Sequence, residues 1–141
     1  MIELKYTGQE EELEKKVINL LETYDMTEEC IIGSMNQGIL QTVKELAPDM
    51  ATVYIAHNLD EEDYDLDFAD SYSIEGKNLT PEMVDRIHYT GKSVYGWTAN
   101  SSVSMARIAD SGADGVVTDD VRLLQTFLRE RACRKAFTSV Y

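Results

Sequence analysis

The chain has 141 residues, of which 43% are apolar and 28% charged, so its size and composition are those of one domain with a buried core. Thirteen Lys and Arg against 26 Asp and Glu give a net charge of −13, and this field repels the phosphates of nucleic acids and anionic lipids. Nucleic-acid binding is therefore not expected, and an anionic small molecule could bind only where a metal or a basic side chain reverses the local potential.

Short apolar runs alternate with amphipathic segments along the whole chain, which predicts an α/β fold with mainly parallel strands. We expect these strands to be buried on both faces, as is usual for parallel sheets. The predicted strands cover about residues 2–6, 30–35, 51–56 and 71–74, a fifth run that holds Tyr95 and Trp97, and residues 115–118.

Helical periodicity and capping residues place a helix after most of these strands. In the second helix Asn36 is the expected N-cap and Pro48 the stop, and Thr80 and Pro81 are expected to begin the next helix. A helix over about 102–110 ends before Gly112. The first helix is predicted to bury Leu13, Val17, Leu20, Leu21 and Tyr24.

Six consecutive β/α units without a linker indicate one domain over residues 1–141, with a tail from about residue 135 that is expected to fray. Six units are two short of a closed eight-stranded barrel, so the predicted fold is an incomplete TIM-type (β/α) barrel. No apolar run is long enough for a membrane span and no leader opens the chain. We therefore expect a soluble chain, cytoplasmic by default, although a longer parent protein could be attached to a membrane.

Loops at the carboxyl ends of parallel strands carry the chemistry of such folds. Trp97 and Asp119 follow this rule, and either could instead be a core or capping residue. Glu3 and Lys5 share one side of their strand and would face the barrel interior near its mouth, unless they form an exposed pair at an edge. His57 also follows a strand, but the sequence shows no partner for it.

The segment Gly96-Trp97-Thr98-Ala99-Asn100, followed by Ala113-Asp114-Gly115-Val116-Val117-Thr118-Asp119, resembles the end of the glycerophosphodiester phosphodiesterase family. That family carries W-T-x-N and D-G-[IV]-[IV]-T-D segments in its last barrel strands. Ile2-Glu3-Leu4-Lys5 and Gly33-Ser34-Met35 extend the match along nearly the whole chain.

This resemblance implies roles for individual residues. Glu3 would bind a divalent metal, Ca²⁺ or Mg²⁺, while Lys5 and Trp97 would bind substrate, with Trp97 against the glycerol or alcohol portion. Loop contacts would come from Ser34, Asn100 and Asp119.

The family's catalytic histidines, in H-R-G and H-D segments, and its E-N and E-x-D metal segments are missing from this sequence. The resemblance therefore implies part of a metal-dependent enzyme that hydrolyses glycerophosphodiesters to glycerol 3-phosphate and an alcohol. No catalytic residue is assigned in this chain, which alone is expected to be inactive and to bind metal weakly or not at all.

The alternative is a self-contained α/β binding or regulatory domain without catalysis, favoured by an acidic, His-poor sequence with no nucleophile motif. In either case an open barrel leaves strand edges unpaired, which predicts a homodimer or a higher oligomer.

Overall fold

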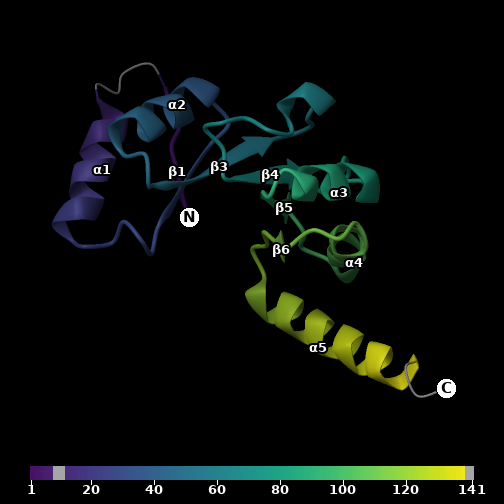
Figure 1. Cartoon of the computed structure of the whole chain (residues 1–141). Helices are drawn as coiled ribbons and strands as arrows, with labels where there is room; N and C mark the ends of the chain where they lie inside the picture. Colours follow the sequence, from purple (N-terminus) through teal and green to yellow (C-terminus); the bar gives the residue numbers. More distant parts are fainter. Residues whose placement is uncertain (8–11, 139–141) are drawn as a thin grey trace.

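The computed structural model describes residues 1–7 and 12–138. Six parallel strands follow one another in the sheet in the order of the chain, β1 to β6, and form a half-barrel with the helices on its outer side (Figure 1). The predicted fold class, an incomplete (β/α) barrel of about six parallel units, is confirmed.

The strands are short, and each pairs in parallel with the next one along the chain. They are β1 (Ile2–Glu3), β2 (Ile31–Ser34), β3 (Ala51–Ala56), β4 (Ser71–Glu75), β5 (Ser93–Trp97) and β6 (Gly115–Val116). The first, second and last are shorter than the sequence predicts, whereas the fourth is one residue longer and includes Glu75.

The helices connect these strands. They are α1 (Leu13–Thr23), α2 (Gln37–Leu46), α3 (Pro81–Tyr89), α4 (Ser102–Asp110) and α5 (Val121–Thr138), with a 3₁₀ turn, η1 (Glu61–Asp63), between β3 and β4. Because α5 continues to Thr138, the first four residues of the tail expected from about residue 135 are helical, and their fraying stays a prediction. Residues 139–141 of that tail lie outside the described residues.

The helix ends form at the predicted residues because the signals are local. The Asn36 side chain accepts hydrogen bonds from the N–H groups of Gly38 and Ile39, and the Thr80 hydroxyl accepts one from Met83 N–H. Gly112 follows α4 with φ of +86°, a left-handed conformation that glycine adopts without strain.

Two apolar clusters on the outer side of the sheet make up the core. One lies under α1 and α2, and the other lies under α3 and α4. Tyr54 and Phe68 pack against both clusters, with their rings 6.4 Å apart in an edge-to-face arrangement, so the two clusters are continuous.

The buried face of α1 agrees only in part with the predicted one, since Leu13, Val17 and Leu21 pack in the cluster under α1 and α2. Leu20 and Tyr24 are 58% and 68% exposed, whereas Glu14, Ile18 and Leu21 are buried. Glu14 accepts a hydrogen bond from the Tyr6 hydroxyl, which satisfies its carboxylate inside the protein. The apolar pattern was therefore right for Leu13, Val17 and Leu21 and wrong for Leu20 and Tyr24, because Glu14 and Ile18 take part of the core side.

The concave side of the half-barrel is less covered than the outer side. On β5, Val94 and Gly96 are buried under helices, whereas Ser93, Tyr95 and Trp97 on the concave side are only partly buried. The expected burial of every strand on both faces is therefore wrong for β5, and also for β6. A cavity of about 230 Å³ on this side is lined by Met1, Ile31, Val53, Ser73, Tyr95 and Val117.

Among the described helices, none combines the length and the apolarity that crossing a bilayer requires.

Candidate functional site

The carboxyl ends of all six strands meet at one edge of the sheet, because every neighbouring pair is parallel. Side chains two residues apart on a strand point to the same side. Glu3 and His57 therefore share the concave side with the cavity-lining Met1 and Val53, and Glu75 and Trp97 share it with Ser73 and Tyr95. Glu75 and Trp97 are also direct neighbours in the register of β4 and β5.

Glu3 and Lys5 form an ion pair at this edge, with 3.2 Å between Lys5 Nζ and Glu3 Oε1. Leu4, between them, is only 4% exposed and packs in the cluster under α1 and α2. The charged pair is open to solvent, with exposed fractions of 34% for the Glu3 side chain and 69% for that of Lys5. An open cavity of about 510 Å³ lies beside it, between the residues after β1 and those after β2.

Three charged or titratable side chains form a second group at the ends of β3 and β4. His57 Nδ1 lies 3.0 Å from Glu75 Oε2, and Lys77 Nζ lies 2.9 Å from Glu75 Oε1. Hydrogen bonds from Lys77 and then from His57 hold the pKa of the Glu75 carboxyl below its ordinary value, so this carboxylate is ionised at neutral pH.

Trp97 is held in place from two directions. Its indole Nε1 donates a hydrogen bond of 2.9 Å to the Ser73 carbonyl, and its own carbonyl accepts one of 2.7 Å from Gly76 N–H. The His57 ring lies against the indole, with 5.1 Å between ring centroids and a tilt of 56°. Trp97 therefore joins the His57–Glu75–Lys77 group instead of lying in the core.

Asn100 and Asp119 connect the loops that follow β5 and β6. Asn100 Nδ2 donates to Asp119 Oδ2 at 2.6 Å, and Asn100 Oδ1 accepts from Asp119 N–H at 2.9 Å and from the Thr118 hydroxyl at 3.2 Å. Ser34 is buried and donates to the Leu4 carbonyl at 2.8 Å, which fastens β2 to the end of β1. All three side chains hold the loops and strand ends around the concave side in position.

The described residues do not fit a complete site for a divalent metal. Glu3 supplies one carboxylate, whereas Ca²⁺ takes roughly six to eight oxygen ligands and Mg²⁺ takes near-octahedral coordination. No group of three or more His, Cys, Asp or Glu side chains is placed to hold a metal ion anywhere in the described ranges.

Glu75 and Lys77 escaped the sequence analysis, and His57 was left there without a partner. The fourth strand was expected to end at Ile74, which put Glu75 into a loop whose direction the sequence does not define. The partner of His57 is 18 residues further along the chain and becomes its neighbour only through the pairing of β3 with β4. The usable signal was the alternation Ser71, Ser73, Glu75, which places a charged side chain on the concave side.

Comparison with known proteins agrees with this architecture. Residues 2–123 match the Glycerophosphoryl diester phosphodiesterase family. A glycerophosphodiester phosphodiesterase of Caldanaerobacter subterraneus subsp. tengcongensis is 28% identical over 121 residues, which cover 84% of this chain and 50% of that protein.

Solved structures show the same fold. A phosphodiesterase of Oleispira antarctica in complex with the product sn-glycerol-3-phosphate gives a TM-score of 0.79 at 22% identity, over 90% of this chain and 53% of that one. A glycerophosphodiester phosphodiesterase from Parabacteroides distasonis gives a TM-score of 0.81 at 18% identity, over 92% of this chain and 56% of that one. This chain thus spans about half the length of the relatives it matches.

Proposed function

The chain belongs to the glycerophosphoryl diester phosphodiesterase family, and from that premise we propose that it forms the substrate-binding half of a phosphodiesterase. The reaction is the hydrolysis of a glycerophosphodiester to glycerol 3-phosphate and an alcohol. The observation that carries this proposal is the position of the Glu3–Lys5 pair and of Trp97, which share the concave side at the carboxyl edge of the sheet.

Lys5 is the proposed phosphate ligand. On a chain with a net charge of −13 a phosphate needs a local cation, and the Lys5 ammonium is 69% exposed beside an open cavity. Trp97 provides an aromatic wall for the organic part of the substrate. Glu3 is the proposed ligand of a divalent metal, together with ligands that the described residues do not supply.

This half alone is expected to turn over negligibly, because its sequence lacks the histidine segments of the family. Groups that transfer protons raise the rate of such a reaction by about a hundred- to ten-thousand-fold. The alternative, a binding domain without catalysis, is favoured by the absence of a metal-ligand cluster among the described residues. The two proposals differ in the expected ligand, because only the phosphodiesterase half is expected to bind glycerol 3-phosphate through Lys5, with little change when Ca²⁺ or Mg²⁺ is added to this chain alone.

Ligand-detected NMR with glycerol 3-phosphate, with and without these ions, tests the proposal. We expect saturable binding that Lys5→Met weakens about tenfold, the loss of one charge-assisted contact of about 1.4 kcal/mol. Lys15→Met is a matched control, since Lys15 pairs with Glu12 at the same 3.2 Å but on α1. Equal affinities of the Lys5 variant and the native chain, or no binding by the native chain, would contradict this proposal.

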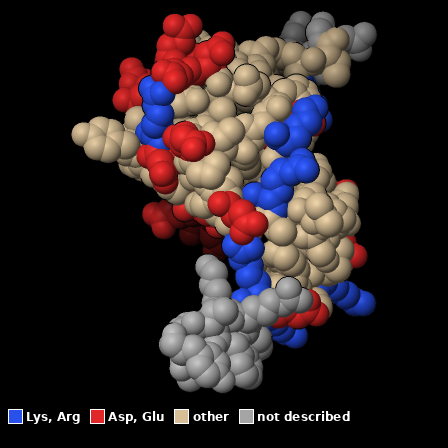
Figure 2. Space-filling model, turned by 90° about the vertical axis from the view of Figure 1, so that its right-hand side faces the viewer, with Lys and Arg blue, Asp and Glu red and all other residues tan. Residues whose placement is uncertain are grey.

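We also propose that a second copy of the chain covers the concave side. Within the described residues β1 and β6 each pair with one strand only, and Tyr95 beside the cavity is incompletely buried. The face shown in Figure 2 is less suited to association, because Lys and Arg side chains lie among Asp and Glu there and the chain carries a net charge of −13.

A further inference from the structure

The first and the last helix each expose a pair of apolar side chains on one flank. On α1, Leu20 and Tyr24 lie one turn apart and face solvent. On α5, Val121 and Leu128 lie two turns apart and are 58% and 48% exposed. Because apolar residues at helical spacing usually cover a neighbouring element, both flanks are helix faces that the described residues leave uncovered.

The exposed flank of α5 is turned away from α4. Phe127 and Glu130 line the groove between these two helices. Val121 and Leu128 lie about 100–180° around the helix axis from Phe127 and Glu130, at 3.6 residues per turn. Leu124 lies between the two sets and packs against the core cluster. The exposed pair therefore lies on the side of α5 where a further helix would pack.

The two flanks lie at opposite ends of the arc of helices (Figure 1). The helix α1 follows β1 and α5 follows β6, and within the described residues these two strands each pair with one strand only. On its other side α1 packs beside α2, since Ile18 and Leu21 share a cluster with Ile39 and Leu40. Both apolar pairs thus border an open edge of the half-barrel.

The segments that carry these flanks have opposite charge. The sequence of α5 contains five basic residues and one acidic residue, although the whole chain has a net charge of −13. Arg129 directly follows Leu128, and no ion pair joins it to another residue in the described ranges. The stretch from residue 17 to residue 43 contains no Lys or Arg, and its acidic residues are all exposed: Glu22, Asp25, Glu28 and Glu29.

The carboxyl end of α1 lacks a cation of its own. The helix dipole disfavours carboxylates at this end, and the last turn of α1 contains no basic residue. All helices of a parallel β/α array run in the same direction. Leu20 and Leu128 each stand seven residues after the first residue of their helix, from 13 to 20 and from 121 to 128. If α1 and α5 lay side by side at this level, the basic residues from Arg129 onward would face the acidic stretch after Leu20.

We propose that α5 of one copy binds α1 of a second copy, and that a two-fold dimer makes this head-to-tail contact twice. Val121 and Leu128 pack on Leu20 and Tyr24, and the Arg129 guanidinium meets the carboxylates that follow α1. The second copy proposed above thereby has a defined contact, which does not depend on phosphodiesterase activity. The family match ends at residue 123, so most of α5 lies outside it.

A second copy explains both flanks at once. The two ends of the arc border the concave side, so two copies that are joined at both ends enclose it. Salt screens charges further apart than about 8 Å at physiological ionic strength, which weakens the repulsion between two acidic chains and spares the close contacts. An anionic lipid surface would explain the basic α5 but not the exposed Leu20 and Tyr24 of α1.

Sedimentation velocity of the native chain and of variants at exposed positions tests the contact. Leu20→Glu and Leu128→Glu should each raise the dissociation constant of the dimer at least about tenfold, because a charge enters an apolar contact. Leu46→Glu is the matched control, since Leu46 on α2 is 48% exposed, as Leu128 is, and this variant should associate like the native chain.

The role of charge has its own control. Arg129→Glu should weaken the dimer, whereas Arg107→Glu should leave it unchanged. Arg107 is exposed on α4, and the substitution there changes the net charge by the same amount. Equal effects of these two variants would mean that total charge, and not the contact of α5 with α1, controls association, and would overturn the proposal.

Mixing the variants distinguishes a head-to-tail contact from a contact of two like flanks. The Leu20→Glu chain keeps a native α5, and the Leu128→Glu chain keeps a native α1. An equimolar mixture should contain a dimer, held by one intact contact, at concentrations at which neither variant associates alone. A mixture that stays monomeric, or either variant dimerising alone with native affinity, would overturn the contact.

Two further outcomes are decisive. If the native chain cosediments with phosphatidylglycerol vesicles and Arg129→Glu abolishes this without changing the mass in solution, α5 binds lipid and the proposed contact is wrong. A native chain that is monomeric would overturn this contact together with the proposed second copy. In either case glycerol 3-phosphate binding through Lys5 would still decide the proposed phosphodiesterase function separately.

Discussion

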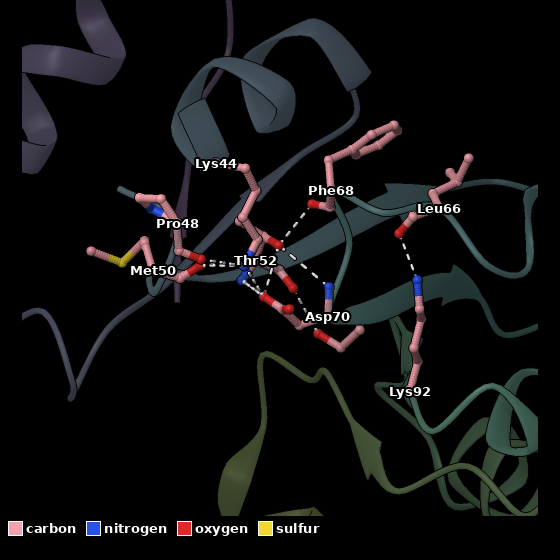
Figure 3. A network of polar contacts seen from close by, with 9 residues as sticks. Lys44, Pro48, Met50, Thr52, Leu66, Phe68, Asp70 and Lys92 are labelled. Carbon is pink, nitrogen blue, oxygen red and sulfur yellow. Dashed lines mark hydrogen bonds and ion pairs between the residues drawn. The ribbon is translucent and has the colours of Figure 1, made fainter. Parts of the chain in front are cut away.

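Asp70 links the amino ends of β3 and β4 through a network of buried and half-buried polar groups (Figure 3). Its Oδ2 accepts from Lys44 Nζ at 2.8 Å and from both the N–H and the hydroxyl of Thr52, at 2.8 and 3.0 Å. The same ammonium donates to the carbonyls of Pro48 and Met50. Burial alone would raise the pKa of the Asp70 carboxyl, but the bonds from Lys44 and Thr52 outweigh it and hold that pKa below its ordinary value.

Asp70→Asn should therefore lower the free energy of unfolding at pH 7 by about 1–2 kcal/mol. This value is reduced because solvent partly screens the Lys44–Asp70 ion pair. Because the folded-state pKa is depressed, the stabilisation is present above the unfolded pKa of about 4 and is lost as the pH falls through the folded value. Urea unfolding at pH 7 and pH 3 should show a difference between native and variant that shrinks in acid. Asp49→Asn, a change at an exposed residue nearby, is the control. If the difference in unfolding free energy between the native chain and Asp70→Asn grew in acid, the predicted direction of the pH dependence would be wrong.

At the scale of elements, β5 and α4 approach so closely that only glycine fits at position 96. A Cβ there would lie 2.6 Å from Cγ2 of Ile108. Gly96→Ala should therefore destabilise the fold by about 1–3 kcal/mol, as overpacking does in a filled core. Ile108→Ala removes the obstructing atoms at a cost of its own of about 2–5 kcal/mol.

The double variant tests the cause of this effect. If the clash with Ile108 is responsible, Gly96→Ala and Ile108→Ala together should cost less than the sum of the two single changes. Chemical denaturation of all four proteins gives the coupling, and strictly additive losses would mean that Ile108 is not the obstacle.

The sequence predicted those features of the helices and strands that depend on neighbouring residues, and missed those that depend on contacts between distant segments. Six parallel strands and the caps at Asn36 and Thr80 follow from signals a few residues long, and they are confirmed. On α1 the expected burial of Leu20 and Tyr24 was wrong, because part of the core side is taken by Glu14, whose carboxylate accepts a hydrogen bond from Tyr6, eight residues away. At the candidate site, Glu3 and Trp97 were proposed from motifs, whereas Glu75 is connected to His57 only through strand pairing, which local patterns do not contain.

For the whole molecule, the proposed second copy predicts an association that can be measured. Light scattering coupled to size exclusion should give a mass of at least twice 15.9 kDa at tens of micromolar protein. Tyr95→Lys, on the concave side, should shift this distribution toward monomer, because it puts a charge into the covered surface. Tyr89→Lys is the control, since Tyr89 on α3 is 94% exposed. A native chain that elutes as a monomer of 15.9 kDa would contradict the association.

Strand order that follows chain order also bears on how the protein opens. Among the described residues each strand pairs only with its neighbours in the sequence, as units do in a stacked repeat array, so the ends can detach while the middle stays paired. The four strands β2 to β5 have paired neighbours on both sides, whereas within the described residues β1 and β6 have one each. Amide hydrogen exchange should therefore be slowest in the two middle strands, β3 and β4, and should accelerate in steps toward both edges of the sheet.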